Sequence, residues 1–515
     1  MKKYLITTFS VLFLSLISFA AKFVIIPMDE RNSLESFIEN TNLFIHYYCD
    51  DFILASTDET IANALIIDDN AFNDMGLYAI VYCDNEMRSE YLAQSSKSGQ
   101  LLWSNDDVLI MKILTDDFSP AKNDGMIMIS KDMKAKYTKT TFDFPIITEK
   151  DNEISAFIDE VSIDIMMNVV QRLQNFETRY YNHDSAYAAQ DWIKTQYENL
   201  GLEVILHDFP FPFSNPNSSD NVIAVQYGTE FPDEYIVCGG HYDSRNQNSH
   251  GNNHDIAPGA DDNATGVAGI LETARILSQT DFKRSIIYCS FSAEEWGLVG
   301  SGKYAQQCAL DEMKILAYFN MDMTGYLKPG TEIHIDLVYP NTAQPLANYY
   351  MNVCDIYFPD LLIERGFLTG ASSDHASFNN NGFMGIFPFE DVYYYSPYIH
   401  TEQDMIGLSV NNEEQMKIFT QANIACVATL AKYDDIIGIE SLNNSILIYP
   451  NPANDKIYIK GEYIYKQFLI FDINGKLVST ISVDSEITEI DVSKFPQGLY
   501  LVNVDNELIG KFVKK

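Results

Sequence analysis

Hydrophobic residues recur along the chain with spacings that change from one region to the next. Short runs rich in β-branched and aromatic residues predict strands in the first third, at Phe23–Pro27, Tyr78–Tyr82 and Val108–Leu114. From about Asn152 the spacing becomes three and four residues, which predicts an amphipathic helix. The residues on that spacing are Ile158, Val161, Ile165, Val169, Leu173 and Phe176. A second helix is predicted at Ala186–Leu200, before the helix-ending Gly201.

Further along, hydrophobic strands and amphipathic helices alternate. The predicted elements are strands at Asn221–Tyr227, Glu234–Gly239, Ser285–Phe291 and Lys314–Asn320, and a helix at Val267–Leu277. This alternation predicts an α/β domain with a mixed central β-sheet and helices on both faces. From about Ile437 short strands separated by Asn-Pro, Asn-Gly and Gln-Gly turns predict a small β-sandwich. The region before the α/β domain is expected to be α+β.

Length and charge narrow the class of protein. The 515 residues suffice for two to four domains, and 46% of them are hydrophobic, so the chain can bury sizeable cores. The formal charge of −38, from 34 Lys and Arg against 72 Asp and Glu, repels phosphate groups and anionic lipid. We therefore expect no nucleic-acid partner and no binding to membrane surfaces.

The first twenty residues have the pattern of a cleaved signal peptide. Lys2 and Lys3 precede the hydrophobic stretch Leu5–Ile17, and Ser18-Phe19-Ala20 offers a cleavage site. The alternative is a membrane anchor, but the stretch is shorter than the roughly 20 residues of a spanning helix. No later stretch is long and apolar enough to span a membrane, so we expect export.

Seven cysteines give an odd count without any CxxC motif. Cys238 and Cys289 lie inside predicted strands and are expected to be core residues. One or two disulfides are possible after export, and the sequence does not indicate their pairing.

Acidic residues and a histidine gather at the ends of predicted strands. The strand ends carry His241, Asp243, Glu294, Glu295 and Asp322, and the start of the helix at Val267–Leu277 carries Asp261 and Asp262. Open α/β sheets bind ligands at the carboxyl edge of their strands, so these side chains are expected to lie together. Gathered carboxylates repel one another unless a cation neutralises them, and imidazole with carboxylate is a ligand set that suits zinc.

Each of these clusters has an ordinary explanation when taken alone. A histidine after a strand is usually packed, a Glu-Glu pair is usually a solvated strand end, and an Asp-Asp-Asn string can cap a helix. Their coincidence at one sheet edge, in chain order, favours a metal site. His375 and His400 are further imidazole candidates, and spacing alone does not choose between them.

Six motifs between residues 155 and 435 resemble those of the secreted bacterial leucyl aminopeptidases, in metallopeptidase family twenty-eight. They are Gly-Gly-His-Tyr-Asp-Ser (239–244), Ala-Pro-Gly-Ala-Asp-Asp-Asn-Ala-Thr-Gly (257–266), Ser-Ala-Glu-Glu-Trp-Gly-Leu (292–298), Asn-Met-Asp-Met-Thr (320–324), Ser-Asp-His-Ala-Ser-Phe (373–378) and Ile-His-Thr (399–401). The resemblance implies a zinc-exopeptidase fold and a two-zinc aminopeptidase that acts on peptides. By the same resemblance, His241 and Asp322 would bind one zinc ion, Glu295 and His400 the other, and Asp262 would bridge both.

The resemblance also implies roles for residues that do not bind metal. Glu294 would be the general base that takes a proton from the metal-activated water and passes it to the leaving amine. Asp243 would orient the imidazole of His241, and His375 would not be a ligand. An apolar substrate pocket is expected from Phe387, Phe389, Tyr395 and Ile399, although these residues could equally fill the core. The family's disulfide loop before Ser-Asp-His is absent from residues 367–372, so a strict leucine preference does not carry over.

Two other functions are compatible with this fold. A glutaminyl cyclase-type enzyme would use a single zinc ion, and a non-catalytic binding module would have lost ligands. Both are disfavoured because the chain retains the complete two-metal set.

The tail resembles the C-terminal sorting domains of type IX secretion. The matching strings are Ile448-Tyr449-Pro450-Asn451-Pro452-Ala453, Phe471-Asp472-Ile473-Asn474-Gly475-Lys476 and Pro496-Gln497-Gly498-Leu499-Tyr500. The resemblance implies the type IX machinery as a partner, and passage through the periplasm to the outside or the cell surface. A carbohydrate- or matrix-binding sandwich is the alternative.

The predicted organisation is a signal peptide (1–20), an N-terminal domain or pro-segment (21–150), a di-zinc peptidase domain (151–436) and a sorting domain (437–515). Residues 21–150 carry no ligand set, and their only histidine is His46. They could be a pro-segment that covers the metal cleft until it is removed, or a permanent domain that shapes substrate access. We favour the pro-segment, because an exported peptidase endangers its maker before release.

Overall fold

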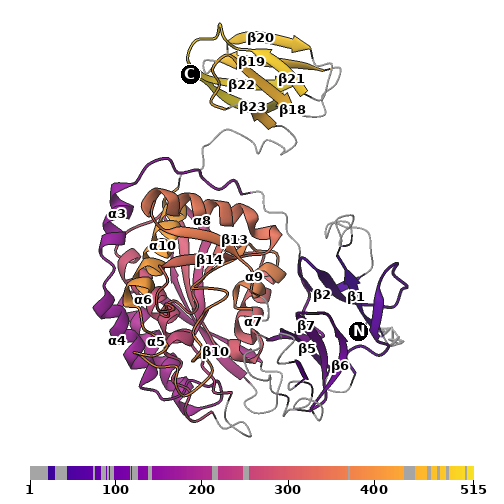
Figure 1. The fold of residues 1–515 in the computed structure, drawn as a ribbon, viewed down its shortest axis with the longest axis vertical. Helices are drawn as coiled ribbons and strands as arrows, with labels where there is room; N and C mark the ends of the chain where they lie inside the picture. The colour runs from indigo at the N-terminus through magenta and orange to yellow at the C-terminus, as the bar shows by residue number, and fades with distance from the viewer. Residues whose placement is uncertain are drawn as a thin grey trace, which may run out of the picture. The chain divides into compact units, whose positions relative to one another are not determined.

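The fold of the chain is known from a computed structural model (Figure 1). It describes residues 21–28, 43–73, 76–82, 98–115, 126–136, 142–210, 218–247, 254–368, 372–433, 447–449, 451–460, 466–472, 476–482, 487–504 and 507–515, and a few single residues between them. The predicted signal peptide lies outside the described residues. The chain forms two compact units, Met1–Tyr433 and Asp434–Lys515.

A mixed sheet of eight strands forms the centre of the first unit, in the order β15-β14-β16-β13-β11-β12-β10-β9. The strands are β9 (Glu203–Pro210), β10 (Ser218–Gln226), β11 (Phe231–His241), β12 (Arg284–Phe291), β13 (Lys314–Asn320), β14 (His334–Val338), β15 (Leu362–Gly366) and β16 (Gly385–Phe389). The four middle strands, β12, β11, β13 and β16, run parallel. Every residue of β12 is buried, which explains its continuous hydrophobic run. The predicted α/β class is confirmed, and β13 has the predicted bounds.

Helices cover both faces of this sheet (Figure 1). One face packs against α3 (Asn152–Asp159), α4 (Ile163–Gln174), α5 (Asp184–Asn199), α6 (Gly266–Leu277), α8 (Gln344–Tyr357) and α10 (Glu413–Lys432). The other face packs against α7 (Val299–Leu310) and α9 (His375–Asn380). The middle strands are therefore shielded from water, and the predicted site residues lie at their carboxyl ends.

The helix predicted from Asn152 onward is two helices, and this part of the prediction is wrong. The side chain of Ser162 accepts a hydrogen bond from the backbone N–H of Ile165 and caps α4, so the helical phase restarts there. The restart turns the predicted core residue Ile165 outward, to 40% exposure. The buried face of α4 consists of Met166, Val170 and Leu173.

Before the α/β domain, the described residues form two four-stranded antiparallel sheets, with orders β2-β3-β1-β4 and β6-β7-β5-β8. Their strands are β1 (Lys22–Pro27), β2 (Phe44–Tyr48), β3 (Phe52–Thr57), β4 (Leu65–Asp68), β5 (Leu77–Tyr82), β6 (Gly99–Ser104), β7 (Val108–Ile113) and β8 (Met126–Ser130). Strand β8 lies at the edge of its sheet and pairs only with β5 among the described strands. These sheets belong to the same compact unit as the α/β domain.

The second unit is the predicted small β-sandwich, with sheets β17-β18-β21 and β20-β19-β22-β23. The strands are β17 (Leu447–Tyr449), β18 (Lys456–Lys460), β19 (Gln467–Asp472), β20 (Leu477–Ser482), β21 (Ile487–Asp491), β22 (Gly498–Val504) and β23 (Glu507–Lys514). Hydrophobic residues of both sheets, including Ile457, Ile470 and Val502, form one core between them.

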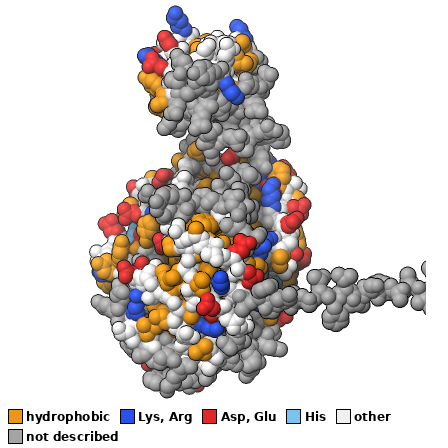
Figure 2. Space-filling view, turned by 90° about the vertical axis from the view of Figure 1, so that its right-hand side faces the viewer, with side chains coloured by type: hydrophobic (Ala, Val, Ile, Leu, Met, Phe, Trp, Pro, Cys, Tyr) orange, Lys and Arg blue, Asp and Glu red, His pale blue; other side chains and the backbone are white. Residues whose placement is uncertain are grey.

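The described surface, cysteines and helices can be compared with what the sequence predicts. On the face drawn in Figure 2, acidic and basic side chains lie interspersed among hydrophobic ones. The described cysteines, Cys49, Cys238, Cys289, Cys308, Cys354 and Cys426, are free, so none of the possible disulfides forms among them. Across the described part of the chain, none of the helices combines the length and hydrophobicity that a membrane crossing needs.

The buried His46 predicts how the stability of the chain depends on pH. Its imidazole lies 2.8 Å from Met133 O and 2.9 Å from Ser56 Oγ, and burial lowers its pKa from 6.5 to about 4. Between those values the unfolded chain binds more protons, so this side chain costs stability as the pH falls, by up to roughly 3 kcal/mol. Thermal unfolding of the His46→Gln variant should therefore show a flatter pH dependence between pH 6.5 and 4 than that of the unaltered chain. Parallel pH profiles would contradict this.

Candidate metal centre

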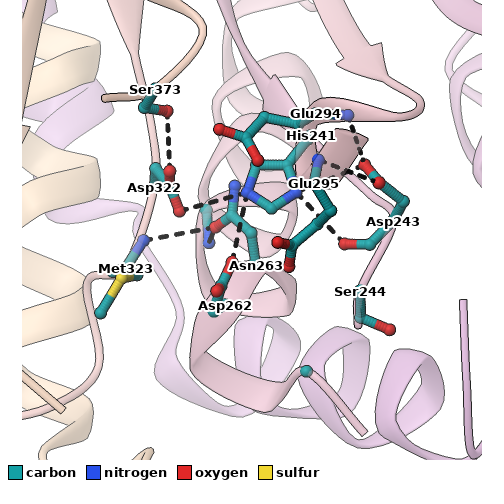
Figure 3. Close-up of polar contacts among 12 residues, drawn as sticks. His241, Asp243, Ser244, Asp262, Asn263, Glu294, Glu295, Asp322, Met323 and Ser373 are labelled. Atoms are coloured by element: carbon teal, nitrogen blue, oxygen red, sulfur yellow. Dashed lines mark hydrogen bonds and ion pairs between the residues drawn. The ribbon is translucent and has the colours of Figure 1, made fainter. Parts of the chain in front are cut away.

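The predicted site residues meet at the carboxyl edge of the central sheet (Figure 3). His241 is the last residue of β11, Glu294 and Glu295 begin the 3₁₀ turn η2 (Glu294–Trp296) after β12, and Asp322 follows β13. Asp262 lies in the π-helical turn η1 (Ala260–Thr265) before α6. Adjacent parallel strands end side by side, so residues far apart in the sequence become neighbours.

The carboxylate of Asp262 lies between two groups of donors. Its Oδ1 is 3.3 Å from His241 Nε2, and that nitrogen is 3.5 Å from Asp322 Oδ1. Its Oδ2 is 2.9 Å from His400 Nε2, which is 3.1 Å from Glu295 Oε2. The two oxygens of one carboxylate therefore face two separate sets of imidazole and carboxylate donors.

Asp243 connects His241, at the end of β11, to the turn η2 that carries Glu294 and Glu295, called here the glutamate turn. Its Oδ1 lies 3.5 Å from His241 Nδ1 and accepts a hydrogen bond from the backbone N–H of Glu294 at 3.1 Å. Its Oδ2 accepts from the N–H of Glu295 at 3.3 Å. Since Asp243 is fully buried, it fixes the positions of both elements at once.

Burial and crowding shift the protonation of the site. Desolvation raises the pKa of Glu294 well above its usual range, and the like charges of Glu295 and Asp322 add to this against the opposing effect of His241. Burial lowers the pKa of His400 and so does the nearby Arg245, but the facing carboxylates outweigh both and raise it to about 9. The side chains are thus arranged for a positive charge placed between them.

The donors fit a bound cation. Within the described residues, Glu295 Oε1 and Asp322 Oδ1 are buried oxygens that accept no hydrogen bond. His241, Asp262 and Glu295 each offer one atom within 4.8 Å of the others, as do His241, Glu294 and Asp322. Nitrogen and carboxylate oxygen in this proportion suit zinc.

Three residues support the centre without having been predicted. Asp404 accepts hydrogen bonds from the backbone N–H groups of Asp261 and Asp262, at 2.9 and 3.1 Å. Ser373 donates to Asp322 Oδ2 at 2.7 Å. Arg245 lies with Nε 2.9 Å from Glu295 Oε2 and a terminal nitrogen 3.0 Å from His400 Nδ1. The sequence signals were slight: Asp404 and Arg245 each follow a predicted ligand by four residues, and Ser373 opens the Ser-Asp-His motif.

Arg179 holds the loop that leads into η1. It is fully buried, and its guanidinium donates to the backbone oxygens of Tyr242, Leu173, Pro258 and Gly259 at 2.6–3.2 Å. Burial lowers its pKa to about 10, which leaves it positively charged at neutral pH. A fixed cation therefore lies behind the carboxylates of the site.

The remaining candidate residues lie beside the centre. The ring of His375 packs 5.3 Å from that of Phe387, and burial lowers its pKa to about 3, so it is neutral and belongs to none of the donor groups above. Phe387, Phe389, Tyr395 and Ile399 line a pocket together with the imidazole and carboxylate donors described above, and Met323, Leu368 and Met126 also line it. Asp261 turns away from the centre and accepts from the N–H of Gly325 at 2.8 Å.

Comparisons with known proteins agree with this site. Residues 221–422 match the model of peptidase family M28, and residues 447–515 match that of the secretion system C-terminal sorting domain. A probable leucine aminopeptidase of Arthroderma otae is 29% identical over 264 residues, which cover 49% of this chain and 69% of the relative. A probable zinc metalloprotease of Pyrenophora teres f. teres is 32% identical over 196 residues, 35% of this chain and 42% of the relative.

Among solved structures, LapB from Legionella pneumophila superposes with a TM-score of 0.55 at 19% identity, over 69% of this chain and 99% of that chain. This likeness shows a shared fold. Residues 221–422 are thus similar to peptidase family M28 and residues 447–515 to the secretion system C-terminal sorting domain, and with its leucine aminopeptidase relatives the chain is a metallo-exopeptidase.

Proposed function

We propose that the chain is a secreted zinc aminopeptidase that binds two zinc ions and removes apolar N-terminal residues from peptides. The observation that carries the proposal is the position of Asp262, whose two oxygens face His241 with Asp322 on one side and His400 with Glu295 on the other. A carboxylate in that position can bridge two ions. A glutaminyl cyclase that works with one zinc ion has no use for the second donor set.

Zinc is the metal that the donors and a relative favour. Two imidazoles and several carboxylates suit zinc, and one relative is named a probable zinc metalloprotease. Bound zinc would supply a water of lowered pKa and would polarise the carbonyl of the scissile peptide. The remaining requirements are a base, an oriented ligand set and a pocket, and the chain's own residues meet these.

Glu294 is the residue placed to move the proton. It begins η2, lies within 4.8 Å of ligand atoms of His241 and Asp322, and retains partial exposure to the pocket. A carboxylate in this position can accept a proton from water and then donate it to the leaving amine. Its neighbour Glu295 points to His400 and belongs to the donor set, so the two glutamates have different tasks.

The pocket wall favours an apolar side chain at the substrate's N-terminus. Phe387 and Phe389 are almost fully buried, and they pack with Met323 next to the donors. The positive charge of a free α-amine is compatible with the surrounding carboxylates, which favours substrates with an unblocked N-terminus. The sorting domain points to secretion or the cell surface as the place of action.

The division of labour between the two glutamates can be tested directly. Glu294→Gln should keep the fold and both metal ions but lower kcat by about 10²–10⁴-fold, because an amide cannot shuttle a proton. Steady-state kinetics on a dipeptide-sized amide, with metal analysis of the same preparation, measures both. Glu295→Gln should instead weaken metal binding, and the exposed Glu414→Gln serves as the control. Equal, mild losses from the first two variants would refute the assignment.

The bridging role of Asp262 predicts the metal content. Chelation should abolish activity and zinc should restore it, while Asp262→Ala should lose most of both ions because both donor sets share this carboxylate. Metal analysis after dialysis measures this, with Asp191→Ala on the exposed side of α5 as the matched control. Two tightly held ions in Asp262→Ala would show that the ligand assignment is wrong.

The sorting domain should be separable from catalysis. Deletion from residue 437 onward should leave the kcat/KM of the purified protein unchanged, because none of the described pocket and donor residues comes from this unit. The truncated chain should remain in the periplasm, as measured by fractionation and immunoblotting. Normal export of the truncated chain would rule out the sorting role.

A further inference from the structure

The N-terminal sheets contact the glutamate turn of the site through the free edge of β8. The backbone N–H of Met128 donates to the carbonyl of Gly297 at 3.0 Å. Gly297 has a φ of +95°, and a Cβ there would lie 2.8 Å from Met128 N and 3.3 Å from Met126 O. Only glycine permits both this backbone conformation and this close approach. Gly297, directly after Glu294-Glu295-Trp296, therefore allows β8 to lie close against the glutamate turn.

The side chains that follow the two glutamates complete the cores of the N-terminal sheets. Trp296, 3% exposed, packs in one cluster with Met126, Met128 and Leu109. Leu298, also 3% exposed, packs with Ile127 and Ile129 on the opposite side of β8. Removal of residues 22–130 would expose these buried side chains directly behind the catalytic turn.

Other contacts fasten the sheets to the α/β domain along their length. The hydroxyl of Tyr48 donates to Asn379 O at 2.7 Å, and Lys303 pairs with Asp132 at 2.8 Å. The connection to α3 is also bound, since Ile147 and Asn352 exchange two hydrogen bonds of 2.7 and 3.1 Å. A segment that is to be released would be expected to have a more polar and less interlocked contact.

Met126 extends these contacts into the substrate pocket. It is the first residue of β8, is 4% exposed, and lines the same pocket as Glu294, Phe389 and Ile399. Met126 is the only pocket-lining residue that comes from the N-terminal sheets in the described part of the chain. The lining of the pocket therefore combines residues of the α/β domain with one residue of the N-terminal sheets.

We propose that residues 22–130 are a permanent part of the enzyme, which holds the glutamate turn in place through β8 and sets substrate preference through Met126. This rests on the proposed aminopeptidase function. It opposes the pro-segment hypothesis, in which the same residues block the site until they are cut away. Met126 acts as a specificity-determining residue because its side chain limits the space beside the apolar wall.

Substrate preference tests the role of Met126. Met126→Ala should shift the ratio of kcat/KM for N-terminal phenylalanine over alanine toward phenylalanine by about 10-fold, because the pocket becomes larger. Met126→Trp should shift the ratio in the opposite direction. Met133→Ala, a methionine of the same region outside the pocket, is the matched control. Unchanged ratios in both Met126 variants would overturn the role of Met126.

Controlled cleavage tests whether residues 22–130 remain part of the folded enzyme. Residues 137–141 are replaced by the recognition sequence of a specific protease, and the full chain is cut after folding. The N-terminal fragment should co-elute with the rest on size exclusion, with kcat/KM on a dipeptide-sized substrate within about 2-fold of the uncut value. A rise in activity on cutting, or elution of the fragment apart from the rest, would overturn the proposal.

These outcomes are distinct from a failure of the proposed function. If the unaltered zinc-loaded chain hydrolyses neither unblocked nor N-acetylated peptides, the aminopeptidase proposal fails. Co-elution of the cut fragment still reports whether the N-terminal sheets remain bound. Release of the fragment without denaturant would then refute permanence on its own.

Discussion

The site depends on holding several carboxylates side by side away from water. Burial of unpaired carboxylates is costly, and their mutual repulsion adds to the cost. The chain offsets this with hydrogen-bond donors placed around the cluster. Asp404 accepts from the backbone of the turn that carries Asp262, and Asp243 accepts from the backbone of the turn that carries Glu294. Parallel strands β11, β12 and β13 bring these turns to one edge of the sheet. The charge balance of the site therefore depends on the order of the strands in the sheet.

The sequence predicts the central sheet and the site region well, because both depend on local patterns. Buried parallel strands appear as continuous hydrophobic runs, and the strand ends carry His241, Glu294 and Asp322 within short motifs. Arg245 and Asp404 could not be chosen in this way. Their partners lie on other elements, and a lone arginine or aspartate in a loop is usually solvated. The break at Ser162 was also missed, because the spacing of hydrophobic residues on either side is helical.

The contact between the N-terminal sheets and the site could not be predicted from the sequence, because it joins distant segments. Contact between Met128 and Gly297 joins segments about 170 positions apart, and no periodicity in either segment encodes it. From the sequence alone, Gly297 would be interpreted as an ordinary turn residue, because nothing in the sequence shows that β8 lies beside it. The preference for a pro-segment came from a general argument about exported peptidases, and the packing of Trp296 and Leu298 is the observation that weighs against it.

The clamp made by Arg179 has a consequence for metal uptake. Its guanidinium binds four backbone oxygens, of which those of Pro258 and Gly259 belong to the loop before Asp262, and Arg245 adds a second positive charge beside Glu295. Part of the negative charge is therefore balanced by the protein itself, and the donor positions are set by hydrogen bonds within the chain. In small zinc-dependent domains the ion supplies the folding energy, so that metal loss unfolds the chain. Here hydrogen bonds within the chain set the positions of the donors, so we expect the chain to stay folded when the metal is removed.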